Sequence, residues 1–263
     1  MRILFLGDVV GSSGCSKLVE NLPSQKKQRE IDFVIVNGEN ADESGVGLTQ
    51  KICEKFFSSG VDVITSGNHI WDQKDIMEFI ENEKRILRPK NFFEPSPGKG
   101  FEIFTTVNNF KIGVLNLIGN VFMKKSNDVF EAANQFINKF KLKKDFDFLV
   151  VDFHGEITSE KNAIGHFFDG QATLVVGTHT HVQTADEQIL PKGTAFLCDA
   201  GMCGPKESIL GRRVEPILHR MKTSMPQTMP VAKGPVEIRG ALVDIDTTTG
   251  KAVGIERIAE IID

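Results

Sequence analysis

Residues 173 to 181 read Thr-Leu-Val-Val-Gly-Thr-His-Thr-His, a short apolar run with two imidazoles directly after it. Four other segments have the same form, an apolar run that ends abruptly in polar or small residues. These runs span Ile3 to Leu6, Phe33 to Val36, Val61 to Ile64 and Phe148 to Phe153. Strands that are apolar on both faces are typical of a sheet covered by helices on each side, so the pattern predicts a layered α/β protein.

Segments with helical periodicity separate most of these runs. The predicted helices span Lys17 to Arg29, Thr49 to Ser58, Gln73 to Glu83, Val129 to Lys143 and Ser159 to Phe168. Asp128 and Thr158 stand in front of two of them. We predict that both are N-caps, because short polar side chains accept hydrogen bonds from the first free amides of a helix.

Two segments have a β-rich texture instead. Phe101 to Ile118 surrounds Asn108-Asn109, a dipeptide suited to a hairpin turn, and the tail contains a second hairpin of Val236 to Asp246 with Ala252 to Ile262. We therefore expect an α/β fold with two mixed sheets flanked by helices, a four-layer α/β/β/α sandwich. Linkers and repeats do not interrupt the sequence, which predicts a single domain over residues 1–263.

The composition excludes several classes of function. The 263 residues include 31 basic and 35 acidic side chains, a net charge of −4 that does not suit a protein that coats nucleic acid. Lysine clusters lie on or beside predicted amphipathic helices, where they form the solvated face, so we expect no stable nucleic-acid complex. Tyrosine is absent from the sequence, which excludes a phenol from any mechanism.

The apolar segments are too short for export or membrane insertion. The first run, Ile3 to Leu6, is followed by a glycine and a carboxylate, and no run approaches the roughly 18 apolar residues of a membrane span. The four cysteines form no Cys-x-x-Cys pair, which favours buried, reduced thiols. We predict a cytoplasmic protein with no membrane contact.

Polar side chains that can bind metal follow five of the predicted strands. Ligands collect at the carboxyl ends of strands in open α/β sheets, so these segments should meet at one cleft. A single metal ion needs about four protein ligands, and a larger set favours two ions about 3.5 to 4 Å apart with a bridging carboxylate. The candidate metal ligands are Asp8, Glu39, Asn40, Asn68, His154, His179 and His181.

The donor types indicate which metals would bind. Carboxylate, amide and imidazole donors without thiolate suit Fe, Mn or Zn better than Cu(I) or Ca. His179 and His181 would share one face of a regular strand, whereas in an irregular loop each could reach a different ion. Taken alone, each segment has a structural alternative: Asp8 could be a turn residue or helix cap, and His154 a core histidine.

Several of these motifs resemble, in order, those of calcineurin-like metallophosphoesterases: Gly7-Asp8, Gly67-Asn68-His69, His154 and Gly177 to His181. The sequence is most similar to the YmdB-like bacterial phosphodiesterases, through Gly-Asp-Val-Val-Gly at residues 7–11 and Asn-Gly-Glu-Asn-Ala at 37–41. Asp199 to Met202, Gly204-Pro205 and Ala232 to Gly234 also look like that branch. The resemblance covers nearly the whole chain and implies the metallophosphoesterase fold with a binuclear metal centre.

The sequence departs from the wider superfamily at two positions. Asp8-Val9-Val10 stands where the general pattern has Asp-x-His, and Glu39 with Asn40 stands where that pattern has a bridging aspartate. For Asn40, a hydrogen bond that orients Glu39 is the alternative to direct ligation. The resemblance implies that one ion is held by Asp8, Glu39, Asn40 and His181, and the other by Glu39 as the bridge, Asn68, His154 and His179.

The resemblance further implies a phosphoric ester hydrolase, a phosphodiesterase that converts 2',3'-cyclic nucleotides to 3'-nucleotides. In that mechanism a water shared by two cations loses a proton and attacks phosphorus. His69 would protonate the leaving oxygen or donate a hydrogen bond in the transition state. The expected partner is therefore a small phosphoester or cyclic nucleotide.

Three other residues, Met202, Arg212 and Arg213, are candidate substrate contacts. Arg212 and Arg213 could clamp a phosphate, or form a solvated surface pair. Met202, with Met225 and Met229, could line a pocket for a base, or simply pack within loops.

Two other functions remain open, a broad phosphatase and a non-catalytic scaffold that binds a nucleotide. Every position of the branch pattern is filled, which favours catalysis. The long apolar edges of the closing hairpin also favour a homo-oligomer.

Overall fold

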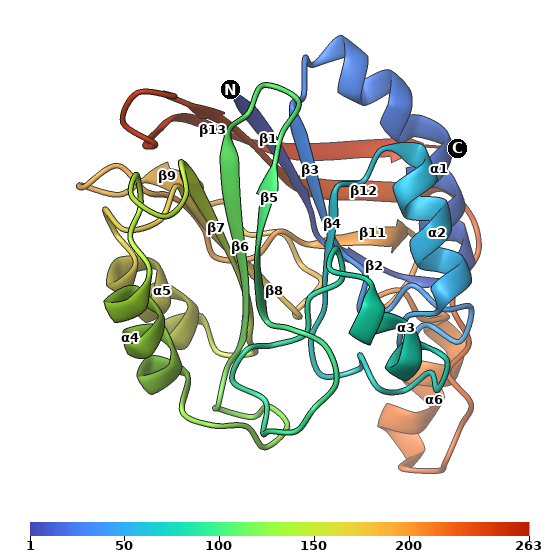
Figure 1. The fold of residues 1–263 in the computed structure, drawn as a ribbon. Helices are drawn as coiled ribbons and strands as arrows, with labels where there is room; N and C mark the ends of the chain where they lie inside the picture. Colours follow the sequence, from blue (N-terminus) through green and yellow to red (C-terminus); the bar gives the residue numbers. More distant parts are fainter. Residues whose placement is uncertain (263) are drawn as a thin grey trace.

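The structure, a computed structural model that describes residues 1–262, contains two mixed sheets (Figure 1). The first sheet has seven strands: Arg2–Leu6 (β1), Asp8–Val9 (β2), Phe33–Asn37 (β3), Val63–Thr65 (β4), Met202–Pro205 (β11), Val236–Ile245 (β12) and Ala252–Ile262 (β13). The strand order is β2-β11-β12-β1-β3-β4, and β13 also pairs with β12. Since β1, β3 and β4 run parallel, their carboxyl ends lie at the same edge.

The second sheet has six strands: Phe101–Thr105 (β5), Lys111–Ile118 (β6), Phe148–His154 (β7), Leu174–Thr178 (β8), Gln188–Ile189 (β9) and Ala195–Leu197 (β10). They follow the order β5-β6-β7-β8-β10-β9. Strands β6, β7, β8 and β10 are parallel, and the edge strands β5 and β9 are antiparallel to their neighbours.

Six helices accompany the sheets: Gly11–Gln28 (α1), Gln50–Ser59 (α2), Ile76–Asn82 (α3), Val129–Lys139 (α4), Thr158–Phe167 (α5) and Val214–Thr223 (α6). Helices α1 to α3 lie on the side of the first sheet, and α4 and α5 on the side of the second (Figure 1).

Alternate residues of the central strands are buried in different layers. In β3, Val34 and Val36 pack toward α1 and α2, whereas Ile35 packs between the two sheets. In β7, Val150 also packs between the sheets, and Val151 faces α4 and α5. These central strands are therefore apolar on both faces because each face has its own partner layer, which confirms the predicted four-layer α/β/β/α sandwich.

Both hairpins are present as predicted. Strands β5 and β6 pair antiparallel around a turn in which Asn109 has a positive φ of 63°, and β12 pairs antiparallel with β13. Asp128 caps α4, since its carboxylate accepts a hydrogen bond from the amide of Glu131 at 2.8 Å.

Several helix boundaries differ from the prediction. Helix α1 begins six residues before the predicted Lys17, because Gly14 lets its first turn lie against the backbone of Cys203 without a clash. Helix α4 ends at Lys139 rather than at Lys143, where a positive φ of 64° turns the chain toward β7. Helix α3 begins at Ile76 rather than at Gln73, whose side chain instead bonds to the loop at residues 42–46.

The predicted cap at Thr158 is wrong. Thr158 is the first residue of α5, and the cap position is held by Ile157, which has no capping side chain. The Ile157 carbonyl accepts the first helical hydrogen bond, from the amide of Lys161.

Among residues 1–262, each helix is too short or too polar to cross a membrane. The cysteines within that range are buried and unpaired, as their spacing predicts.

Candidate metal centre

All seven predicted ligands follow or end strands at one edge of the sandwich. Asp8 begins β2, two residues beyond the end of β1, and Glu39 and Asn40 follow β3. Asn68 follows β4, His154 is the last residue of β7, and His179 and His181 follow β8. The parallel strands of both sheets thus deliver their terminal side chains to the same place, as expected for open α/β sheets.

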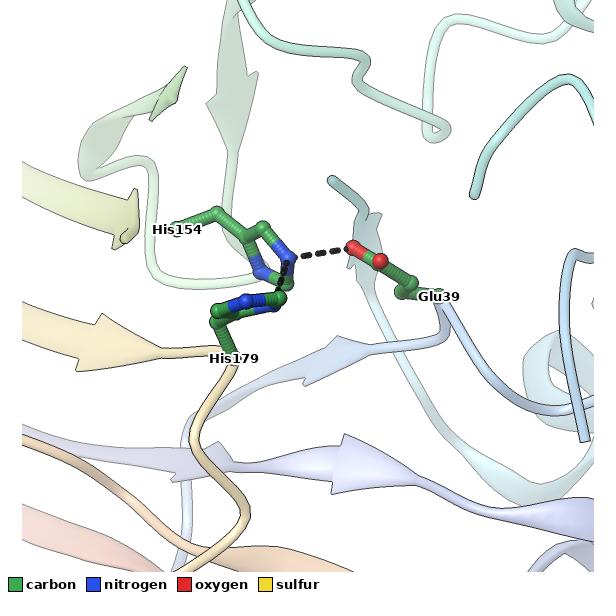
Figure 2. Close-up of side chains that lie close together, drawn as sticks. All are labelled: Glu39, His154 and His179. Atoms are coloured by element: carbon green, nitrogen blue, oxygen red, sulfur yellow. Dashed lines mark hydrogen bonds and ion pairs between the residues drawn. The ribbon is translucent and has the colours of Figure 1, made fainter. Parts of the chain in front are cut away.

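The first group of side chains centres on Nε2 of His154. This atom lies 2.7 Å from Oε2 of Glu39 and 3.1 Å from Nδ1 of His179 (Figure 2). The amide oxygen of Asn68 lies 3.1 Å from the same nitrogen. Four electronegative atoms from four segments therefore face one another within the protein.

The protons of this group point elsewhere. Thr178 donates its hydroxyl proton to Asp152 at 2.8 Å, so at 2.9 Å it accepts a hydrogen bond from Nδ1 of His154. Nε2 of His179 lies 3.1 Å from the carboxylate of Glu156, which fixes the proton of that ring on Nε2. His154 Nε2 and His179 Nδ1 consequently face Glu39 and Asn68 as lone pairs.

The second group has the same character. Nδ1 of His181 lies 3.3 Å from the carbonyl oxygen of Leu210, which can only accept, so Nε2 carries the lone pair. This Nε2 lies 3.2 Å from the amide oxygen of Asn40, whose nitrogen donates to the Gly45 carbonyl, and 4.0 Å from Oδ1 of Asp8. A second set of acceptors therefore converges beside the first.

The backbone explains why the two neighbouring imidazoles separate. His179 and His181 have positive φ values of 98° and 65°, so residues 179–181 form an irregular loop beyond β8 and not a continuation of the strand. Such left-handed conformations are uncommon for residues other than glycine, and they cluster at functional sites. Of the two alternatives left by the sequence, the loop is the one observed, and each ring joins a different group.

The electrostatics of the groups match the requirements of a cation site. Burial raises the pKa of both Asp8 and Glu39 to about 7. Burial also lowers the pKa of His154 to about 4 and of His179 to about 3, and it lowers the pKa of His181 as well. The imidazoles are uncharged at neutral pH, and a neighbouring cation would stabilise the ionised carboxylates.

Two further observations indicate that these residues fit metal ions. Within the described residues, Oδ1 of Asp8 and Oε2 of Glu39 are buried without a hydrogen-bond donor, although buried acceptors are normally satisfied. Gly67 borders the first group so closely that a Cβ atom there would overlap Glu39 and the His154 ring. The donor atoms of Glu39, His154 and His179 all lie within 4.8 Å of one another.

His69 lies beside this centre. Its backbone amide donates to Oε1 of Glu39 at 3.2 Å, while its ring Nδ1 lies 2.7 Å from Oδ2 of Asp72. The ring is thus held by a carboxylate, while the backbone of the same residue contacts Glu39.

The candidate substrate contacts lie in other surroundings. The Met202 side chain is only 4% exposed in β11 and offers little surface to a ligand. Arg212 donates to the carbonyls of Gly45 and Met229 at 2.7 and 3.0 Å, so its guanidinium joins two loops. Arg213 is exposed and lies 3.6 Å from Glu215, the solvated alternative.

The sequence assigns no role to Asp152 or Asp199, two carboxylates that support the centre. Asp152 is fully buried and accepts hydrogen bonds from Asn37, Thr65 and Thr178. Asp199 forms a buried ion pair with Lys161 and accepts hydrogen bonds from Thr180, between the two loop histidines. A carboxylate inside the apolar run Phe148 to Phe153 was the available signal for Asp152.

The two-sheet sandwich, with its acceptor groups at the strand ends, defines the architecture of a metallophosphoesterase. A solved phosphatase of Mycoplasma pneumoniae matches it with a TM-score of 0.92 and 37% identity, covering 100% of this chain and 94% of the other. A protein of Thermus thermophilus matches with a TM-score of 0.92 and 36% identity over 100% of both chains.

Sequence similarity identifies the family. The chain belongs to the YmdB-like protein family, whose model matches residues 4–258. It is 48% identical over 258 residues to a protein of Bacillus subtilis (strain 168) named 2',3'-cyclic-nucleotide 2'-phosphodiesterase, covering 98% of this chain and 96% of that protein. Family membership and the fold therefore confirm the resemblance noted from the motifs.

Proposed function

We propose that this chain is a metal-dependent phosphoric ester hydrolase, a phosphodiesterase that opens 2',3'-cyclic nucleotides and leaves the phosphate on the 3' oxygen. The observation that carries the proposal is the convergence of two groups of lone pairs at a largely buried site, with the protons of all three imidazoles directed away from it. The name of the Bacillus subtilis relative supports the substrate class and the bond that is broken.

The residues would hold two cations, most suitably Fe or Mn, with Zn as the alternative. Asn68, His154 and His179 would hold one ion and Asp8, Asn40 and His181 the other, with Glu39 shared between them. Such ions supply Lewis acidity, which lowers the pKa of an attacking water and offsets charge on the phosphoryl oxygens.

His69 would manage the proton of the leaving oxygen. Because Nδ1 lies against Asp72 at 2.7 Å, Nε2 is the ring atom available to the substrate. Protonation of the departing 2' oxygen prevents the accumulation of an alkoxide, which is the usual role of a general acid at such a step. Asp72 would accept the Nδ1 proton, orient the ring and stabilise the imidazolium, whose Nε2 proton passes to the leaving oxygen.

The proposal is tested by metal analysis and a comparison of substrates. The purified chain, loaded with Mn²⁺ or Fe²⁺, is assayed with 2',3'-cyclic AMP, bis(p-nitrophenyl) phosphate and p-nitrophenyl phosphate. We expect two ions per chain, fastest turnover of the cyclic nucleotide, and adenosine 3'-monophosphate as the product. Asp8→Asn should lower both metal content and turnover, whereas Glu81→Gln, which alters an exposed carboxylate on α3, should change neither.

Each alternative predicts a different result. Fastest hydrolysis of the monoester would make the chain a broad phosphatase. A chain that holds two ions, binds the nucleotide and hydrolyses none of the three esters would be a binding scaffold.

A further inference from the structure

One loop at the edge of the metal centre is unexplained by the proposed chemistry. Residues 119–128 connect β6 to α4, and Lys124 in this loop donates to the backbone carbonyl of Asn68 at 2.6 Å. The same ammonium group lies 3.6 Å from Oδ1 of Asp72, the carboxylate that holds His69. The loop therefore contacts the segment that supplies both a proposed ligand and the proposed acid.

Side-chain hydrogen bonds hold this loop in one shape. The amide of Asn120 donates to the buried carboxylate of Glu160 at 2.9 Å, and the Asn120 side chain donates to Ser126 and to the Asn127 carbonyl, both at 3.0 Å. From outside the loop, Asn91 donates to the same Asn127 carbonyl at 3.0 Å. These hydrogen bonds fix the backbone of residues 119–128, so the exposed side chains of the loop start from a defined backbone position.

Phe122 is the unusual residue in the loop. Its side chain is 85% exposed, the highest value for an aromatic residue in the part of the chain that the structure describes. Its φ is +60°, a left-handed conformation that is a genuine outlier for a bulky residue. The next residue, Met123, packs against the core, so the strained backbone turns Met123 inward and leaves Phe122 in solvent.

Neither the exposure of the Phe122 ring nor the positive φ of this residue stabilises the fold. Exposure of an apolar ring forgoes the stabilisation that burial would give, and the left-handed backbone adds strain. Rigid, exposed aromatic rings near a phosphate site are suited to stacking against a planar base. The chain lacks tyrosine, and its single tryptophan, Trp71, packs against the core, which leaves Phe122 as the exposed ring closest in sequence to Lys124.

We propose that Phe122 forms one wall of a nucleobase subsite, against which the base of the substrate stacks while its phosphate lies at the metal centre. The inference rests on the proposed function, because it says where the base of the proposed cyclic-nucleotide substrate would bind. Consecutive Cα atoms are about 3.8 Å apart, so Phe122 lies no more than about 7.6 Å along the chain from Lys124. Stacking is stronger for larger rings, so purine nucleotides should be preferred to pyrimidine nucleotides.

The test compares nucleotide binding with binding of the phosphate alone. Calorimetric titration of the metal-loaded chain with adenosine 3'-monophosphate and with inorganic phosphate gives two dissociation constants for each variant. In Phe122→Ala, the preference for the nucleotide over phosphate should fall about tenfold, and Phe122→Trp should restore it. The matched control is Val107→Ala, an exposed apolar residue in the β5–β6 turn, which lies at the other end of β6, roughly 26 Å away.

The outcomes separate this inference from the proposed function. Unchanged nucleotide preference in Phe122→Ala overturns the inference, even if the wild-type chain hydrolyses 2',3'-cyclic AMP rapidly. An equal loss in Val107→Ala also overturns it, because the effect would not be local. If the wild-type chain hydrolyses nothing, a selective loss of nucleotide binding in Phe122→Ala still supports the subsite while the proposed activity fails.

Discussion

The hydroxyl oxygen of Thr178 lies 2.9 Å from Nδ1 of the His154 ring. Because Thr178 donates its own proton to Asp152, it can only accept from the ring, and this contact directs the lone pair of His154 toward Glu39. In Thr178→Val the shape is kept and the acceptor is lost. We expect metal affinity to fall about 10- to 100-fold, measured by competition with a chelator.

Thr178→Ser is the matched control, since it keeps the hydroxyl and should bind metal like the wild type. Equal affinities in the valine and wild-type chains would show that Thr178 does not set the tautomer of His154.

His69 and the metal ligands should be separable by mutation. His69→Ala removes the ring but keeps the backbone amide that donates to Glu39, so metal content should remain at the wild-type level. Turnover should fall about 10²- to 10⁴-fold, the usual contribution of a general acid. Metal analysis and steady-state kinetics on the same sample measure both, and loss of metal would make His69 a ligand.

Metal affinity should fall as the pH is lowered through neutrality. The pKa of Asp8 and Glu39 is raised to about 7 by burial, so below that value protons compete with metal for both carboxylates. Each should weaken binding by up to about tenfold per pH unit. The pKa values of His154 and His179, about 4 and 3, keep those rings from contributing near neutral pH.

The same shifts affect the stability of the metal-free chain. Above the ordinary carboxyl range and up to about pH 7, folded Asp8 and Glu39 retain protons that the unfolded chain has lost. Their contribution to the free energy of unfolding therefore declines as the pH rises from the ordinary carboxyl range, and it is lost above about 7. Metal titrations at several pH values test the first effect, and a pH-independent affinity would contradict it.

Lys161→Met should destabilise the fold. Lys161 and Asp199 are 2% and 1% exposed and lie 2.5 Å apart, so the methionine variant leaves a carboxylate buried without its partner. Such a change lowers the free energy of unfolding by about 3 to 5 kcal/mol. Urea unfolding measures it, with Lys139→Met, an exchange near the end of α4, as the control. A loss below about 1 kcal/mol would mean that Asp199 is neutralised in another way.

Much of the fold could be predicted because its signals are local. Buried apolar runs mark β1, β3, β7 and β8, and turn residues mark both hairpins. Helix ends were less predictable where a boundary depends on tertiary contact: α1 begins where Gly14 meets the backbone of Cys203, and Thr158 lies inside α5 rather than in front of it.

In the candidate site too, local features could be predicted from the sequence and features that depend on tertiary contacts could not. Residue type and position after a strand are visible in the sequence, and they indicated all seven side chains that the structure brings together. The hydrogen bonds that direct these side chains join distant segments, as Asn37 and Asp152 do across 115 positions. The positive φ values at His179 and His181 depend on how the loop packs, and the sequence does not signal them with a glycine at either position.

The acceptor groups draw on both sheets, since Asp8, Glu39, Asn40 and Asn68 extend from the first and His154, His179 and His181 from the second. A cation held there would be bound by side chains of both sheets and would therefore link one sheet to the other. Its removal should loosen the strand ends on either side together, so that backbone amides near β3 and β8 exchange with solvent faster while the far ends of the same strands stay protected.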